Sequence, residues 1–168
     1  MSTRPVCHLA LVVLVFAASA CGHPLDEGTW RVSQDRQASE AIDPCMLLAQ
    51  DGSVGDGKLV VTGVELRLNT VVPGVPTPVL MIGRLKNPAA NQPDEFVLQG
   101  SASAVVVQVK GAACQLQFGQ IEIAAQVRDA RRFDGTMTAH YELGLSPDSG
   151  CPSVCDFQVG VSGTWMSP

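Results

Sequence analysis

The chain has 168 residues, a formal net charge of −5, a hydrophobic content of 46% and an aromatic content of only 5%. The acidity is mild and charges of both signs are scattered, so no basic stripe exists to replace the counterions of a nucleic acid, and nucleic-acid binding is not expected. The scarcity of aromatic rings also disfavours a carbohydrate-binding platform of stacked aromatic side chains.

Residues 9–20 form an apolar segment without charge that ends just before Cys21. As a helix this segment would span about 18 Å, whereas the hydrocarbon core of a bilayer is roughly 30 Å thick. A permanent transmembrane helix is therefore not expected, and a removable export signal over residues 1–20 is predicted. The small side chains of Ala18, Ser19 and Ala20 suit the narrow cleft of a signal peptidase.

The sequence Ala18-Ser19-Ala20-Cys21 resembles the cleavage motif of bacterial lipoproteins, in which small residues precede an obligatory cysteine. The resemblance implies cleavage after Ala20, a diacylglycerol in thioether linkage on Cys21, and acylation of the new N-terminus. Three acyl chains are enough for stable membrane attachment. Family members held in the inner membrane often have Asp after the cysteine, and Gly22 here implies the outer membrane. The alternative is an ordinary secretory signal that leaves Cys21 without lipid.

Four cysteines remain beyond this region: Cys45, Cys114, Cys151 and Cys155. An even number in an oxidising compartment predicts two disulfides. The spacing of Cys151 and Cys155 would also suit a metal, but the other two lie far apart without a nearby histidine, so neither a metal nor another cofactor is expected. Because Cys114 and Cys155 each open a predicted strand on its apolar face, we expect the pairs Cys114–Cys155 and Cys45–Cys151.

Strand signals dominate the rest of the chain. Apolar and polar residues alternate, and stretches rich in Pro and Gly separate the predicted strands, which cover residues 29–33, 58–69, 78–85, 95–100, 103–109, 114–127, 133–143 and 155–165. This pattern predicts an all-β fold, a single antiparallel β-sandwich or small β-barrel of about eight strands over residues 29–168. Residues 21–28 would form the lipidated tether.

Three local patterns make sharper predictions. Residues 58–69 alternate as one strand with Val60, Thr62, Val64, Leu66 and Leu68 on one face. Residues 43–50 could form one or two helical turns, with Asp43 as the cap and Pro44 in the first position. Within residues 114–127 the apolar face formed by Cys114, Leu116 and Phe118 changes phase at Gly119, which predicts a β-bulge.

The chain has Gly28-Thr29-Trp30 in its first predicted strand and Trp165 in its last. A Gly-x-Trp in the first strand resembles lipocalins, whose barrel closes by pairing the first strand with the last. The resemblance implies a barrel that carries a small apolar ligand, and it keeps the barrel open beside the sandwich. For both tryptophans we expect packing at one end of the core.

No catalytic motif is complete. The loop at residues 52–58 is similar to a phosphate-binding loop, but Leu59 replaces the required Ser or Thr and a strand follows instead of a helix. The same loop lacks the spacing of a calcium-binding EF-hand. His140 lies on a polar strand face between Thr138 and Glu142, without a Gly-x-Ser-x-Gly nucleophile motif nearby. We expect a solvated histidine with a cross-strand partner, and a hydrolase using His140 is the alternative.

Three arginines, Arg128, Arg131 and Arg132, cluster between two predicted strands together with Asp129 and Asp134. A basic hairpin tip could touch anionic lipid or polysaccharide. The two local aspartates leave little net field, so a solvated turn is expected.

These observations favour a non-catalytic, lipid-anchored protein of the bacterial cell envelope that acts as a binding or structural module, and not an enzyme. Its expected partner is the membrane, contacted through the N-terminal lipid on Cys21. A protein partner or a small apolar ligand is not identified by the sequence.

Overall fold

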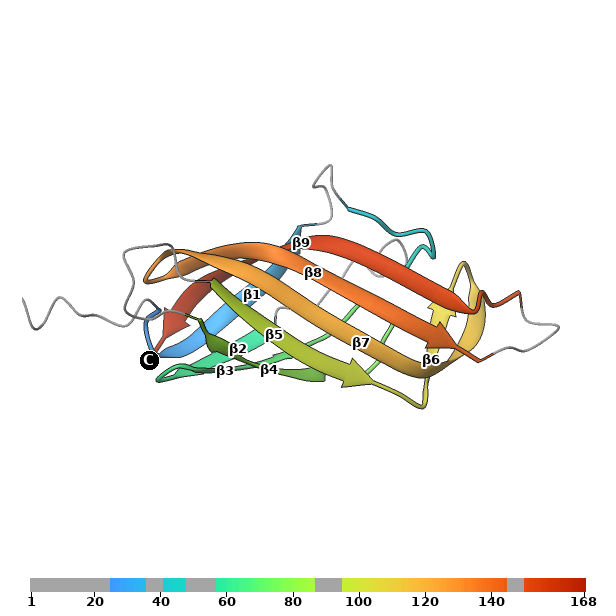
Figure 1. Ribbon diagram of the computed structural model, residues 1–168, viewed down its shortest axis with the longest axis horizontal. Coiled ribbons are helices and arrows are strands. Elements are labelled where there is room, and N and C mark those ends of the chain that lie inside the picture. The colour runs from blue at the N-terminus through green and yellow to red at the C-terminus, as the bar shows by residue number, and fades with distance from the viewer. Residues whose placement is uncertain (1–24, 36–40, 48–56, 87–94, 145–149) are drawn as a thin grey trace, which may run out of the picture.

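A computed structural model describes residues 25–35, 41–47, 57–86, 95–144 and 150–168. These residues form antiparallel strands and no helix (Figure 1). The strands are β1 (Gly28–Asp35), β2 (Gly57–Thr62), β3 (Glu65–Thr70), β4 (Val79–Leu85), β5 (Glu95–Ala102), β6 (Val105–Val109), β7 (Ala112–Asp129), β8 (Arg132–Leu143) and β9 (Val154–Ser167).

Eight of the strands close into a barrel. The neighbours run β1-β2-β3-β4-β5-β7-β8-β9, and β1 pairs with β9 to complete the circle. In this closing pair Trp30 lies opposite Trp165. The prediction of a small antiparallel barrel is therefore confirmed, and the sandwich alternative is excluded. Closure leaves no free sheet edge around the barrel wall itself.

The extra strand, β6, continues β5. Both strands pair with the same edge of β7, β5 along residues 119–126 and β6 along residues 112–116. Between them the backbone of Ala104 has a left-handed φ of 57°. This bend turns β6 away from the line of β5 at one end of the barrel (Figure 1).

Residues 58–69 are not one strand, as the alternation predicted, but the hairpin β2–β3. Thr62 pairs with Glu65, so the turn contains only Gly63 and Val64, and Gly63 takes a φ of 56°. The reversal shifts the alternation by one residue. Leu66 and Leu68 face the core as expected, whereas Val60 and Thr62 face outwards. The glycine at the centre of the run was the sequence signal for this turn.

The β-bulge predicted in residues 114–127 is present in β7, and it lies at Gln117. Leu116 pairs with Leu143 and Phe118 pairs with Glu142, so one residue of β7 is left over. The bulge directs Phe118 outwards, where its side chain is 44% exposed, and the expected apolar face therefore ends at Leu116. Gly119 faces inwards under the ring of Tyr141, and a side chain there would collide with the ring.

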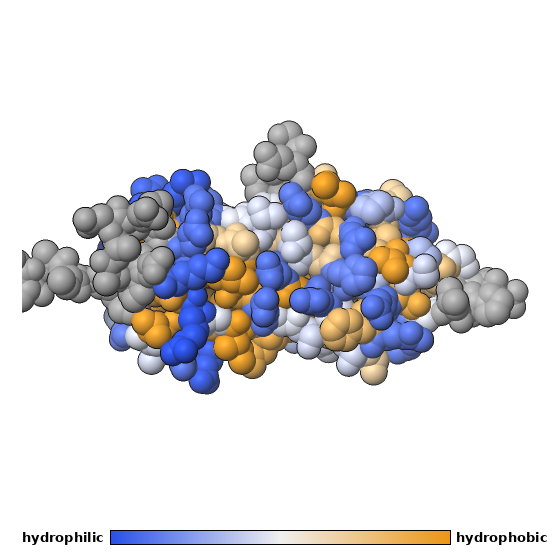
Figure 2. Space-filling view, in the orientation of Figure 1, coloured by the Kyte–Doolittle hydropathy of each residue, from blue (hydrophilic) through white to orange (hydrophobic). Residues whose placement is uncertain are grey.

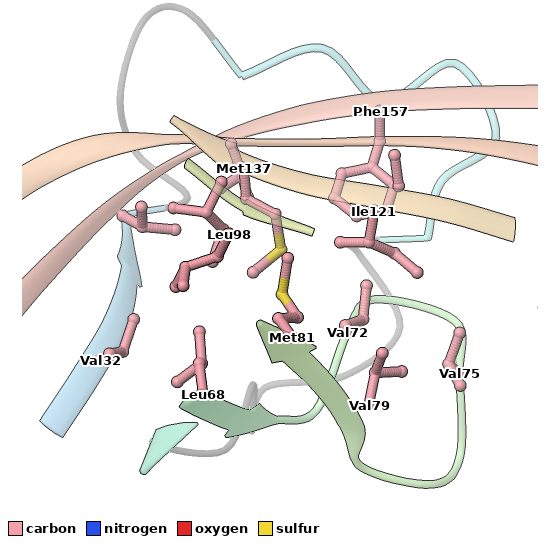
Figure 3. Close-up of a cluster of buried hydrophobic side chains, with 14 of the residues drawn as sticks. Val32, Leu68, Val72, Val75, Val79, Met81, Leu98, Ile121, Met137 and Phe157 are labelled. Atoms are coloured by element: carbon pink, nitrogen blue, oxygen red, sulfur yellow. The ribbon is translucent and has the colours of Figure 1, made fainter. Parts of the chain in front are cut away.

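Side chains fill the barrel interior. Leu68, Met81, Leu98, Ile121 and Met137 come from β3, β4, β5, β7 and β8, and all five have no solvent-accessible surface (Figure 3). A cavity wide enough for a water molecule would give its walls accessible surface. These residues therefore enclose no space for an apolar ligand.

Four cysteines form two disulfides at the end of the barrel where β6 lies, and the predicted partners are exchanged. The bonds are Cys45–Cys155 and Cys114–Cys151. Cys114 on β7 and Cys155 on β9 are both buried, but β8 separates their strands. Alternate strands of a sheet lie about 10 Å apart. A disulfide needs Cα atoms within about 7 Å. The predicted pair was therefore wrong.

Residues 41–47 cross this end of the barrel as an irregular segment. Ile42 forms an isolated bridge with Gln158 of β9. The side chain of Asp43 accepts a hydrogen bond of 2.8 Å from the backbone of Leu47, and the described residues form a turn and not the predicted helix. We call this part of the molecule the capped end: residues 41–47, β6 and the two disulfides.

Candidate functional site

The opposite end of the barrel holds the first described residues of the chain, which lead from the predicted lipid attachment site. Asp26 donates a backbone hydrogen bond of 2.8 Å to the carbonyl of Ala130, in the turn between β7 and β8. The indole N–H of Trp30 donates to the carbonyl of Asp26 at 3.1 Å. The indole N–H of Trp165 donates to the carbonyl of Glu27 at 3.1 Å. Both tryptophans thus hold the incoming backbone.

Side chains add three further contacts. Leu25 is completely buried. The guanidinium of Arg131 donates to the carboxylate of Asp26 at 2.8 Å, and the carboxylate of Glu27 accepts a hydrogen bond of 2.9 Å from the backbone of Gly63. We name Leu25, Asp26 and Glu27, with these partners, the tether clamp. The sequence placed residues 25–28 in the tether, and the structure packs them on the barrel.

The local sequence explains how the clamp forms. Gly28 has a φ of 127°, which glycine adopts readily, and its Cα passes against the carbonyl of Ser167 so closely that a Cβ would collide with it. The chain can therefore bend from the clamp into β1. Two residues later, Trp30 returns its indole to Asp26 while its ring packs 5.8 Å from that of Phe133.

Phe133 lies at the centre of the aromatic packing at this end. Its ring meets that of Phe96 edge to face at 5.0 Å, and it also covers Gly163 on the neighbouring strand β9. A Cβ on Gly163 would overlap the Phe133 ring. We call this part of the molecule the tether end: the tether clamp, the β7–β8 turn and the last residues of β9.

The β7–β8 turn carries the arginine cluster. Arg128 pairs with Asp134 at 2.9 Å and Arg132 with Asp129 at 2.9 Å, and these side chains are largely exposed. Hydrogen bonds from the backbone of Arg131 and the side chain of Arg132 lower the pKa of Asp129. The predicted hairpin tip is present, and its arginines are paired with local aspartates as expected. Figure 2 shows the hydrophilic band that crosses the molecule near this end.

His140, the catalytic alternative, lies on the outer face of β8. Its Nδ1 atom is 2.7 Å from Oδ1 of Asp156, the residue opposite it on β9, while the side chains are 47% and 66% exposed. The interpretation as a solvated histidine with a cross-strand partner is confirmed, and that partner is Asp156 of β9.

A shallow hollow of about 350 Å³ surrounds this pair. The described residues of its walls contribute carboxylates, amides and the hydroxyl of Thr138, and include neither a serine nor a cysteine nor a lysine. Thr138 thus carries the only hydroxyl among the described residues that line the hollow, and the Nδ1 atom of the imidazole is held by Asp156.

Two larger hollows also lie on the outside of the barrel. One of about 420 Å³ covers β5, β7 and β8 at the tether end and contains Lys86, Glu95, Arg128 and Asp134. The other, of about 470 Å³, lies where β4 and β5 diverge and is lined by Leu80, Ile82 and Val105 together with polar residues. Both are open to solvent, so neither encloses a ligand.

Other predicted features fall partly outside the structure. Cys21 and the loop at residues 52–56 lie outside the described residues. Among the residues described, no group of three or more His, Cys, Asp and Glu side chains could hold a metal ion. No helix in the same part of the chain is long and apolar enough to cross a bilayer.

The clamp residues were not singled out by the sequence. Asp26 and Glu27 looked like ordinary polar tether residues, and the tryptophans were expected to serve core packing. The sequence did contain one signal for the clamp. A buried indole N–H needs a hydrogen-bond acceptor, and the first and last strands each carry a tryptophan two residues after a glycine. Comparisons with protein-family models, curated proteins and solved structures found no match to this chain.

Proposed function

We propose that this protein is a non-catalytic, lipid-anchored module of the bacterial cell envelope, attached through Cys21 to the outer membrane and exposing a rigid barrel for binding or structural contacts. The observation that carries the proposal is the tether clamp. Leu25 lies only four positions after Cys21, and it is already fixed in the barrel. A rigid connection so close to the predicted lipid suits a body that is displayed from a membrane.

The remaining geometry supports a role without catalysis. The His140–Asp156 pair is exposed, and the described residues that line its hollow include no serine, cysteine or lysine, so this geometry adds no support to the hydrolase alternative. The carrier alternative needs an internal cavity of several hundred Å³. Met81 of β4 and Met137 of β8, from opposite walls, point toward one another and have no accessible surface, so the interior adds no support to a ligand inside the barrel (Figure 3).

Membrane fractionation tests the anchor. The native protein is expected in the membrane fraction, resistant to a high-salt wash, with the mass of a diacylglycerol and an acyl chain on Cys21. Cys21→Ser should release the protein or leave it unprocessed, since the acceptor sulfur is gone. Cys7→Ser is the matched control, because Cys7 belongs to the predicted signal and its loss should change neither the location nor the mass. Native protein that is soluble and carries no lipid mass would overturn the proposal.

A further inference from the structure

We propose that the tether end is the membrane-facing surface of the protein, lying against the phospholipid headgroups with the barrel projecting outwards and the capped end farthest away. This inference rests on the proposed lipid anchor at Cys21. It adds an orientation and a contact surface, neither of which follows from lipidation alone.

Chain length gives the first argument. Four residue steps separate Cys21 from Leu25, and an extended chain covers at most about 3.5 Å per residue, so the two residues are within about 14 Å of one another. Leu25 is completely buried at the tether end. Acyl chains on Cys21 would be inserted in the bilayer, and this end of the barrel would therefore be held at the headgroup layer.

The clamp gives the second argument. Asp26 and Glu27 are each held by both backbone and side-chain hydrogen bonds, to partners in β1, β9 and the turns that follow β2 and β7. A tether that merely trailed from the first strand would add free residues between the lipid and the barrel. Here the chain is fixed to the barrel from Leu25 onwards, which restricts how far the barrel can tip.

Surface chemistry at the tether end gives the third argument. Arg131 lies over the ring of Trp165, 4.5 Å from the ring centroid, and the next residue, Met166, is 51% exposed. Trp and Arg suit the membrane interface, where one part of the side chain contacts acyl chains and the polar part contacts headgroups. Guanidinium groups bind phosphate oxygens well.

Outside the clamp, Arg128 and Arg132 are paired with Asp134 and Asp129, and these pairs are exposed. An exposed ion pair contributes at most about 1 kcal/mol, so lipid phosphates could replace the carboxylates at little cost. Because the charges of the turn are balanced, attachment to the membrane would depend on the lipid anchor. The turn would determine which end of the barrel contacts the headgroups.

The two ends are far enough apart to be distinguished. Phe118 lies ten residues before Arg128 on β7 and its side chain is exposed. Ten residues of strand span about 33 Å, and a barrel tilt of about 40° leaves about 25 Å along the axis. An outward probe at Phe118 should therefore lie well away from a bilayer that touches the tether end.

Tryptophan quenching tests the orientation. Both native tryptophans, Trp30 and Trp165, lie at the tether end. The full lipidated protein is placed in phosphatidylethanolamine–phosphatidylglycerol vesicles whose acyl chains are brominated close to the headgroup. Native emission should fall relative to unbrominated vesicles, and Trp165→Phe should lose most of that fall because Trp165 is the more exposed ring.

The matched far-end probes are Phe118→Trp and Val106→Trp, two exposed positions near the capped end. Each is made in the native protein, so that the Trp165 contact of the clamp is kept, and its added emission, taken as the difference from the native protein, should not be quenched. Using two positions guards against one variant that fails to fold. Quenching of a far-end probe as strong as that of Trp165, or no quenching of Trp165, overturns the orientation.

The mass of Cys21 is measured on the same sample. If the lipid mass is present and Trp165 is not quenched, the orientation is wrong while the lipid anchor stands. If the lipid mass is absent, the proposed anchor is wrong, and the orientation that depends on it is rejected as well.

Discussion

The two ends of the barrel are held together in different ways. At the tether end Phe133 packs against both Trp30 and Phe96, and indole hydrogen bonds fix the incoming chain. At the capped end both disulfides, Cys45–Cys155 and Cys114–Cys151, join irregular segments to the long strands. The first end relies on packing, and the second relies on covalent bonds.

Backbone regularity accounts for the difference. The β2–β3 and β7–β8 hairpins turn tightly at the tether end, so neighbouring strands keep their side chains in contact up to the turn. Residues 41–47 at the capped end have only one bridge to the sheet, between Ile42 and Gln158. Strand pairing therefore contributes little to the stability of this segment. The disulfide holds the segment in place instead of ladder hydrogen bonds.

The largest expected effect comes from the capped end. Replacing Cys45 and Cys155 together by alanine removes a link that closes 110 residues, and the free energy of unfolding should fall by about 5 kcal/mol. Replacing Cys114 and Cys151 removes a link that closes 37 residues, with an expected loss of about 4 kcal/mol. Urea unfolding of both double variants measures the losses. A smaller loss for the first variant than for the second would contradict the account based on loop length.

Gly163→Ala should break the packing at the tether end. The added methyl group overlaps the Phe133 ring, which is confined by Trp30 and Phe96, and the expected loss is about 2 kcal/mol. Ser162→Ala, at the neighbouring outward position, is the control and should change stability by less than about 0.5 kcal/mol.

A double-mutant cycle sharpens this test. Phe133→Leu shortens the side chain that the methyl group added by Gly163→Ala would meet, so the combined variant should be less destabilised than the sum of the single changes, by about 1 kcal/mol. Additive effects would show that the Phe133 ring is not the obstacle.

Tyr141 links β8 to the loop that follows β3, and its hydroxyl donates to the carbonyl of Pro73 at 3.0 Å. Burial raises the pKa of Tyr141 well above its ordinary value near 10. The folded state therefore keeps the neutral phenol, whereas the unfolded chain ionises it above pH 10. The free energy of unfolding is unaffected by this group below pH 10 and falls as the pH rises above that value. The expected slope is about 1.4 kcal/mol per pH unit.

Tyr141→Phe cannot ionise and should lose this alkaline slope, at a cost of about 1 kcal/mol near neutral pH for the missing hydrogen bond. Unfolding measured from pH 8 to pH 11 in both proteins compares the two effects. Equal slopes above pH 10 would show that another group governs the alkaline limit.

The smallest expected effect concerns Asp129 in the β7–β8 turn. Its pKa is lowered in the folded state, so its contribution to stability is present above the unfolded value of 3.8 and is lost as the pH falls through the lower, folded value. Asp129→Asn should remove this contribution, and Arg132→Gln should remove part of it. Acid unfolding below pH 4 is the measurement, and identical curves for all three proteins would refute the assignment.

Regular strands were the part of the fold that the sequence could predict. Strict alternation located β8 and β9 almost to the residue, because one face of each strand is buried and the other is solvated. The hairpin at Gly63 and the outward turn of Phe118 were missed, since a one-residue phase change looks the same whether it comes from a turn, a bulge or noise in the pattern.

Long-range pairing was beyond the sequence. The disulfide partners depend on β8 lying between β7 and β9. The alternation of apolar and polar residues predicts single strands, and it does not predict the order of strands in the sheet. The clamp was missed for the same reason, because Trp165 meets Glu27 across 138 positions of sequence. Cys21 was recognised by its motif alone, and it remains a prediction.

The clamp also determines how a mechanical load would enter the molecule. Traction on the anchor would reach Leu25–Glu27 and then run along β1, which is bonded to β2 on one side and to β9 on the other. Ladder hydrogen bonds lie across the strand direction, so a pull along β1 shears both rows at once and does not open them one after another. Under the proposed anchor at Cys21, tension would therefore load β1 in shear along both of its ladders.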